Sequence, residues 1–403
     1  MAAALRSRNP KISNPRSLFS TLSSPLSSPL SEKPSTPFRS LKSTIRSERD
    51  PDKLAEIFQN SSDSPRFRRD RSVFDLTVRK LASSRRSDLI DRVLGHQKSF
   101  AAAPASKSEG FWIRIMKLYS NSGMVDQAVR MFDQMEEIGC NRTDKSLCAL
   151  LSTFLCNRQF DRLHESFSEI PKKFGISPSV VAYNLVLRAF VEEKSIESAR
   201  SLVAKMEKEN GVKPDILSYN ILLRGFHDAG DEIGFNEILK EISWKGLSPN
   251  VTTYNYRILS HCKKNESFKA KELFDVMISK GIKPNLASYN AVIDGLSKEG
   301  DLTSAKSLFE SMRSGGVLPN NVTYVTLVRH LVEKGEFDSA LEMCKKSLKR
   351  KWVPPFESMV GLVNGLVKIS KVDEAKGIVE KMKKKLTSSA LDSWMKVEGT
   401  LPL

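Results

Sequence analysis

Four asparagines recur in the middle of the chain at an almost constant interval, each directly after a tyrosine. They are Asn184, Asn220, Asn255 and Asn290, at intervals of 36, 35 and 35 residues. A side-chain amide carries both a hydrogen-bond donor and an acceptor, so it can pair with the edge of an unstacked nucleotide base. Asparagine is a poor helix former, so helix propensity does not explain the recurrence. These four residues are therefore the first candidates for ligand contact.

A second polar position follows the same period. Its members come directly after a proline and close each repeating unit: Asp215, Asn250, Asn285 and Asn320. Each closing residue precedes a helical pattern, where Asp and Asn are favoured N-caps. The closing residues therefore cap helices, contact a ligand together with the asparagines, or do both.

The elements that must position these residues are pairs of helices. In 286–320, apolar residues recur at helical spacing up to Gly300, which ends one helix. A second amphipathic pattern runs to Gly315, and Pro319 prevents its continuation. One such hairpin cannot bury its apolar faces, so neighbouring units must stack. The sequence predicts an all-α fold, a solenoid of stacked antiparallel helix pairs.

Small and large residues recur in register along the second helices. The small position holds Ala128, Ala199, Ala270, Ala305, Ala340 and Ala375, and the large one, four residues later, holds Phe132, Phe167, Phe274 and Phe309. This register divides 109–390 into units at 109–143, 144–179, 180–215, 216–250, 251–285, 286–320, 321–355 and 356–390. A weaker unit covers about 71–108, within atypical N-terminal helices at 46–108 that we expect to cap the array. Residues 391–403 are expected to form a tail.

The first 45 residues have the composition of an organelle transit peptide. Residues 1–49 hold nine Lys or Arg and only two acids, and the segment is rich in Ser and Pro. Arginines near the start favour a mitochondrial over a chloroplast destination, and a disordered tail is the alternative. The whole chain has a formal net charge of +17. Such a charge suits a polyanionic partner, of which nucleic acid is the commonest.

The sequence lacks the residues that several classes of function require. No stretch is apolar enough for a membrane span, so we expect no membrane partner. The five cysteines form no CxxC pair and no disulfide-like framework, and they are expected to be buried thiols. No phosphate-binding loop, metal-ligand spacing or cluster of carboxylates is present. We therefore expect neither an enzyme nor a cofactor, metal or small-molecule substrate.

The repeat itself resembles the pentatricopeptide repeat of the repeats-only class. In the unit 251–285 the matching residues are, in order, Tyr254-Asn255, Ala270, Leu273-Phe274, Met277, Gly281, Pro284 and Asn285. The tetratricopeptide repeat, its protein-binding relative, has a period of 34 and lacks the recurring Tyr-Asn pair. The resemblance spans about 320 residues and weakens at Val325 and at Met359-Val360. It implies a right-handed superhelix.

The resemblance also implies roles for single residues. In this family the asparagine and the closing residue together choose one RNA base per unit. The implied pair for uridine is Asn184 with Asp215. The implied pairs for cytidine, with some tolerance of uridine, are Asn220 with Asn250, Asn255 with Asn285 and Asn290 with Asn320. The residue three places before each asparagine would lie between successive bases: Val181, Leu217, Thr252 and Ala287. The neighbouring combinations Cys148/Ser179 and Val325/Pro355 depart from the pattern and are expected to be weak or silent.

Three hypotheses for function remain. Short plant-like proteins of this kind, with a mitochondrial type of leader, resemble components of the small subunit of the mitochondrial ribosome. Ribosomal RNA and mitochondrial ribosomal proteins would then be the partners. A solo factor that recognises single-stranded RNA during organellar transcript processing, stability or translation is the alternative. A protein-binding helical scaffold is the third.

Overall fold

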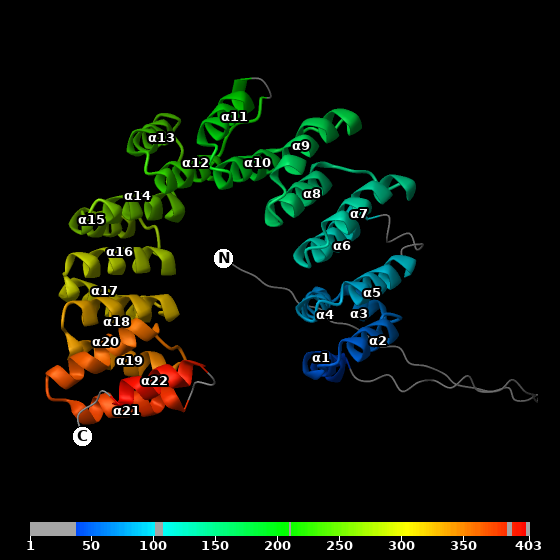
Figure 1. The fold of residues 1–403 in the computed structure, drawn as a ribbon. Helices are drawn as coiled ribbons and strands as arrows, with labels where there is room; N and C mark the ends of the chain where they lie inside the picture. Colours follow the sequence, from blue (N-terminus) through cyan, green and yellow to red (C-terminus); the bar gives the residue numbers. More distant parts are fainter. Residues whose placement is uncertain (1–37, 101–107, 209–210, 385–388, 400–403) are drawn as a thin grey trace, which may run out of the picture.

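A computed structural model describes residues 38–100, 108–208, 211–384 and 389–399. These residues form α-helices α1 to α22, and no β-strand occurs among them. The predicted all-α class is confirmed. Figure 1 shows the helices following one another along an open arc whose two ends lie on the same side.

Eight helix pairs make up the regular array. The first helices are α6 (Glu109–Asn121), α8 (Asp144–Cys156), α10 (Val180–Glu192), α12 (Ile216–Ala229), α14 (Val251–Lys263), α16 (Leu286–Glu299), α18 (Asn321–Glu333) and α20 (Phe356–Lys368). Their partners are α7 (Val125–Glu137), α9 (Phe160–Phe174), α11 (Ile196–Lys208), α13 (Glu232–Trp244), α15 (Ser267–Ser279), α17 (Leu302–Ser314), α19 (Phe337–Lys349) and α21 (Val372–Lys383). Each first helix packs against its partner and against the next first helix. In Figure 1 the first helices α8, α10, α12 and α14 lie toward the inside of the arc, and their partners α9, α11, α13 and α15 lie outside them.

The junction between α16 and α17 shows how the sequence separates two helices. Gly300 adopts φ +98°, a left-handed conformation that glycine enters without steric penalty, and it ends α16. Asp301 then accepts a hydrogen bond from the backbone N–H of Ser304 and caps α17. The helix break predicted at Gly300 is confirmed.

The core lies between the two layers of helices. All six alanines of the small register are fully buried, which permits the close helix approach predicted for them. The repeated tyrosines of the first helices are buried too, and three of the five meet a phenylalanine of the preceding unit edge to face. The ring centroids are 5.0 Å apart for Phe167–Tyr183, 5.0 Å for Phe274–Tyr289 and 5.4 Å for Phe309–Tyr324. The tyrosines therefore hold neighbouring units together.

The N-terminal helices form a distinct cap. They are α1 (Phe38–Ser47), α2 (Pro51–Ser61), α3 (Pro65–Arg69), α4 (Arg71–Ser83) and α5 (Ser87–Ser99). Residues 1–37 of the expected leader lie outside the described residues. Its last residues differ from expectation, because α1 packs against α2 and α4 and buries Ile45. The Lys80 ammonium of α4 donates to the carbonyls of Ile45, Arg46 and Glu48 at the end of α1, where a cation offsets the unpaired carbonyls.

The other end of the array also contains more structure than expected. The segment described as a tail includes α22 (Ser389–Gly399), which packs against α21. Trp394 is only 2% exposed, and its ring meets Phe356 at 5.3 Å between centroids. This helix covers the apolar face that the last unit would otherwise leave open.

Neither a long apolar helix nor a cluster of metal-ligating side chains occurs in the described residues. None of the described helices combines the length and apolarity that crossing a membrane requires. Within the same residues, no group of three or more His, Cys, Asp or Glu side chains is placed to hold a metal ion.

Candidate nucleic-acid interface

The four closing residues are all N-caps of first helices. Asp215, Asn250, Asn285 and Asn320 cap α12, α14, α16 and α18. In each case the closing Oδ1 accepts the backbone N–H of a Ser or Thr three residues later, at 2.9–3.2 Å. The hydroxyl of that Ser or Thr accepts the closing residue's own N–H in return. This capping box holds the closing side chain in one orientation.

Each asparagine of the preceding first helix binds to this capping box. Its Nδ2 donates to the closing Oδ1, at 3.2 Å from Asn184, 3.1 Å from Asn220, 3.3 Å from Asn255 and 3.5 Å from Asn290. Its Oδ1 accepts the Ser or Thr hydroxyl at 2.6–2.8 Å. We call each such trio a rung. The rungs are Asn184–Asp215–Ser218, Asn220–Asn250–Thr253, Asn255–Asn285–Ser288 and Asn290–Asn320–Thr323.

The hydroxyl member of each rung is a residue that sequence reasoning missed. Ser218, Thr253, Ser288 and Thr323 are all buried, and each contacts both other members of its rung. These residues could have been identified from the sequence, because a Ser or Thr follows every closing residue by three positions. That spacing is the capping-box pattern, and it repeats with the period of the asparagines.

Within each rung, one terminal atom of the closing side chain has no hydrogen-bond partner among the described residues. In Asp215 this atom is a carboxylate oxygen, which accepts hydrogen bonds. In Asn250, Asn285 and Asn320 it is the amide nitrogen, which donates them. Uracil presents an N–H on its pairing edge where cytosine presents a bare ring nitrogen. An acceptor such as the free Asp215 oxygen can bind the uracil N–H, and a donor such as the free amide nitrogen of the other three can bind the cytosine ring nitrogen.

The four asparagines differ in how far they are buried. Asn184 is 4% exposed and Asn220 is 2% exposed, whereas Asn255 and Asn290 are half-buried. The asparagine oxygen and one N–H are already bound within the rung, so each asparagine retains a single N–H for a ligand. The sequence suggests that each asparagine contacts a base together with its closing residue. In the structure the asparagine amide also holds the closing side chain in place, which leaves one asparagine N–H and one terminal atom of the closing residue for a ligand.

Side chains beside the rungs present exposed apolar surface. Val181 is 55% exposed and Leu217 is 51% exposed, and Thr252 and Ala287 are exposed at the same register. Val322 also occupies this register and is 55% exposed, although sequence reasoning did not single it out. Its position two residues after Asn320 could have identified it from the sequence. These side chains form a row on which flat bases could rest.

The flanking units form no rung of this kind. Cys148 donates to Asp144 at 3.7 Å, and burial together with the Asp144 carboxylate raises the pKa of its thiol to about 12. Ser179 donates its N–H to the same carboxylate. At the other flank Val325 is half-buried and Pro355 caps α20 without a side-chain hydrogen bond. Lys345 and Lys346 lie on the second helix α19, where the pair Lys345–Glu374 is partly exposed.

Family models match most of the array. The description "PPR repeat family" belongs to the model matching 178–228, 249–289 and 284–333. The model "PPR repeat" matches 111–140, 322–351 and 358–385, and "Pentatricopeptide repeat domain" matches 145–193. Together these stretches cover more than half of the chain.

Curated relatives match shorter stretches. Small ribosomal subunit protein mS78 of Arabidopsis thaliana is 36% identical over 169 residues, which is 42% of this chain and 42% of that protein. Small ribosomal subunit protein mS79 of the same plant is 34% identical over 170 residues, again 42% of each chain. The chain thus matches about two fifths of the length of these relatives.

A crystal structure of the pentatricopeptide repeat protein PPR10 with an 18-nt psaJ RNA element aligns over 90% of this chain and 64% of that chain. Its sequence identity is 18% and its TM-score is 0.43.

Proposed function

Because the chain belongs to the pentatricopeptide repeat family, we propose that it binds single-stranded RNA along the inner side of its first helices. One observation carries the proposal: four rungs repeat the same hydrogen-bonded geometry, and each keeps one terminal atom of its closing residue unpaired. A structural cap alone needs no asparagine partner from the preceding unit. A row of oriented donors and acceptors suits a strand that presents one base per unit.

The rungs set the base preference. Asp215 supplies an acceptor for the uracil N–H, and the amide nitrogens of Asn250, Asn285 and Asn320 supply donors for cytosine. Val181, Leu217, Thr252, Ala287 and Val322 separate the bases by apolar contact. The proposed target is a pyrimidine run of four nucleotides, one uridine and three cytidines.

The third rung provides a direct test of this assignment. Asn285→Asp replaces the free amide nitrogen with an oxygen and keeps the Oδ1 that caps α16 and binds Asn255. We expect preference at that nucleotide to change from cytidine to uridine, by ~1–3 kcal/mol, because one donor becomes an acceptor. Fluorescence anisotropy with oligonucleotides that differ only at that position measures the change. An unaltered preference in a variant with wild-type thermal stability would refute base choice by the closing residue.

We further propose that the protein acts in the mitochondrion as part of the small ribosomal subunit. The relatives whose names are small ribosomal subunit proteins support this proposal, as does the basic net charge of +17. Four rungs specify few bases, which suits a protein held in place by many contacts to ribosomal RNA and its proteins. The rung geometry equally suits a solo factor for organellar transcripts, which is the second candidate.

Sedimentation separates these two candidates. A tagged protein from gradient-fractionated mitochondria is expected to migrate with the small ribosomal subunit, and to remain there after messenger RNA is digested. Release into the light fractions after digestion would support the solo factor instead. A protein-binding scaffold would show no RNA affinity that falls with salt concentration.

A further inference from the structure

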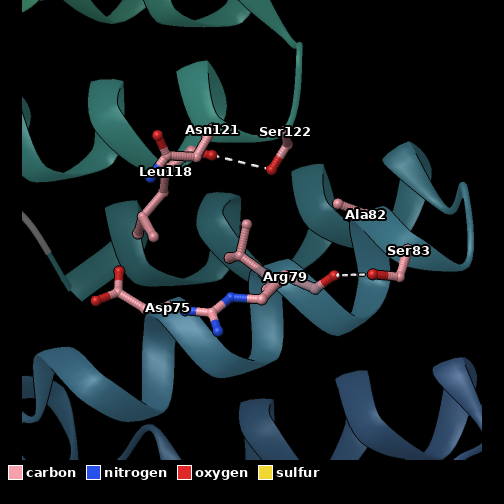
Figure 2. A pocket seen from close by; sticks show the side chains of 8 residues that line it. Asp75, Arg79, Ala82, Ser83, Leu118, Asn121 and Ser122 are labelled. Carbon is pink, nitrogen blue, oxygen red and sulfur yellow. Dashed lines mark hydrogen bonds between the residues drawn. The ribbon is translucent and has the colours of Figure 1, made fainter. Parts of the chain in front are cut away.

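The N-terminal cap and the array are separated by an open cleft. Neighbouring first helices of the array pack along one another, but α4 and α6 pack much less closely. Between them lies a cavity of about 620 Å³, which continues into a second lobe of about 420 Å³. Figure 2 shows Asp75, Arg79 and Ser83 of α4 on one side of the cavity and Leu118 and Asn121 of α6 on the other.

Cations outnumber acids in this cleft. Arg71 and Arg79 line it from α4, and Arg114 and Lys117 line it from α6, whereas Asp75 is its acidic residue. Arg71, Arg79 and Lys117 are exposed, and none of them forms an ion pair with another described residue. The fourth cation has a structural role. Arg114 lies 4.0 Å above the ring of Phe74 and donates to the carbonyls of Arg68 and Asp70.

The cleft lies on the same side of the molecule as the rungs. Arg79 of the cap helix α4 and Lys117 of the first helix α6 each hold the ninth position of their helix, counted from the N1 residue. The asparagines hold the fifth position, one helical turn earlier on the same face. Arg188 of α10 and Arg224 of α12 hold cations at the ninth position too, although Ser152 of α8 interrupts the series and Leu259 of α14 ends it. Arg224 pairs with Asp228 of its own helix at 3.5 Å. Positive charge therefore recurs on this face on both sides of α8, at the cleft and beside the first two rungs.

We propose that the cleft between α4 and α6 binds the phosphates of single-stranded RNA that extends beyond the rungs. The inference rests on the proposed function, because the same strand would occupy both places. The rungs would read four bases, while Arg71, Arg79 and Lys117 bind the sugar–phosphate backbone without reading sequence. Phosphate contacts of this kind supply affinity and orientation in nucleic-acid complexes.

The lining favours a nucleic-acid backbone over an acidic protein. Guanidinium groups bind phosphate through paired N–H donors, and Ser83, Asn121 and Ser122 add further polar groups around the cavity. Protein interfaces place apolar and aromatic side chains at their centre. The lining of this cleft contains no aromatic residue, and its apolar members are few and aliphatic.

The test compares a short RNA with an extended one. The short strand is the pyrimidine tetranucleotide. Each extended strand adds about six nucleotides without bases at either the 5′ or the 3′ end. This length is enough to span the units that separate Asn184 from the cleft. We expect one extension to increase affinity at least about tenfold at low salt. Arg79→Gln with Lys117→Gln should remove this gain and leave binding of the short strand unchanged. The slope of log K against log salt should fall by about 1.4 for two lost phosphate contacts.

A matched pair of variants controls for net charge. Arg130 of α7 and Lys240 of α13 are exposed on second helices and form no ion pair within the described part of the chain. Arg130→Gln with Lys240→Gln therefore removes the same charge away from the cleft, and should preserve the gain. The proposal would be overturned if both double variants lost the affinity gain equally, or if the cleft variant kept that gain. A polyglutamate peptide is also used as a competitor of the extended RNA. If it competes as strongly as the base-free strand does, the cleft belongs to an acidic protein and the proposal is overturned.

The outcomes distinguish the cleft from the rungs. Wild-type protein that binds the short strand but gains nothing from either extension refutes the cleft alone. Extended strands that bind regardless of tetranucleotide sequence, and lose affinity in the cleft variant, support the cleft and refute base reading. Failure to bind any of these RNAs refutes both.

Discussion

Replacing Asn255 and Asn290 together with alanine is expected to weaken binding of a pyrimidine strand by ~1–3 kcal/mol for each lost base contact. Both asparagines are half-buried, so their remaining N–H groups are the ones a base can reach most easily. Alanine also removes the bond that orients the closing residue, Asn285 or Asn320, toward the strand. The variant should therefore lose affinity and base preference together.

The fold should survive this double substitution. The hydroxyls of Ser288 and Thr323 keep their bonds to the closing Oδ1 at 3.1 Å, so no buried donor is left without a partner. Anisotropy titrations at constant salt measure the loss, and circular dichroism checks the helices. Asn141→Ala with Asn236→Ala is the matched control, since both residues are exposed and away from the rungs. Unchanged affinity in the test variant would falsify base reading by the rungs.

Replacing Phe309 with alanine is expected to reduce the free energy of unfolding by ~3–5 kcal/mol. The side chain is fully buried, and its ring meets Tyr324 of the next unit edge to face. Truncation removes the transfer free energy of the ring and leaves a cavity that two stacked helix pairs cannot close without moving. Urea unfolding monitored by circular dichroism measures the loss.

Phe268→Ala is the matched control for that substitution. Phe268 lies in the first turn of the second helix α15 and is 73% exposed, so the same change in composition removes almost no buried surface. We expect its effect to stay within about 0.5 kcal/mol. Equal losses in the two variants would show that phenylalanine content, rather than the contact between units, sets the stability of the solenoid.

Much of the candidate site could be predicted because its members repeat. The asparagines, the closing residues and the exposed aliphatic row all recur with the period of the helix pair, so one register identified them together. The hydroxyl residues recur with the same period but were overlooked, since Ser and Thr near a helix start have an ordinary capping role. The exposed fractions of Asn184 and Asn220 could not be predicted, because burial depends on how closely successive first helices approach.

The sequence by itself determined the helix pairs, their order and the residues that pack between them. Those features depend on local helix signals and on a short apolar period, which act within one unit of about 35 residues. Tertiary structure alone decided three others: the rungs, the capping by α1 and α22, and the cleft between α4 and α6. Each rung joins residues 30–34 positions apart, such as Asn184 to Asp215 and Ser218, and its hydrogen bonds form only when one unit stacks on the next. The caps and the cleft occur where the repeats end. No further unit covers the exposed helix faces there, and the repeat period does not predict which segment covers them.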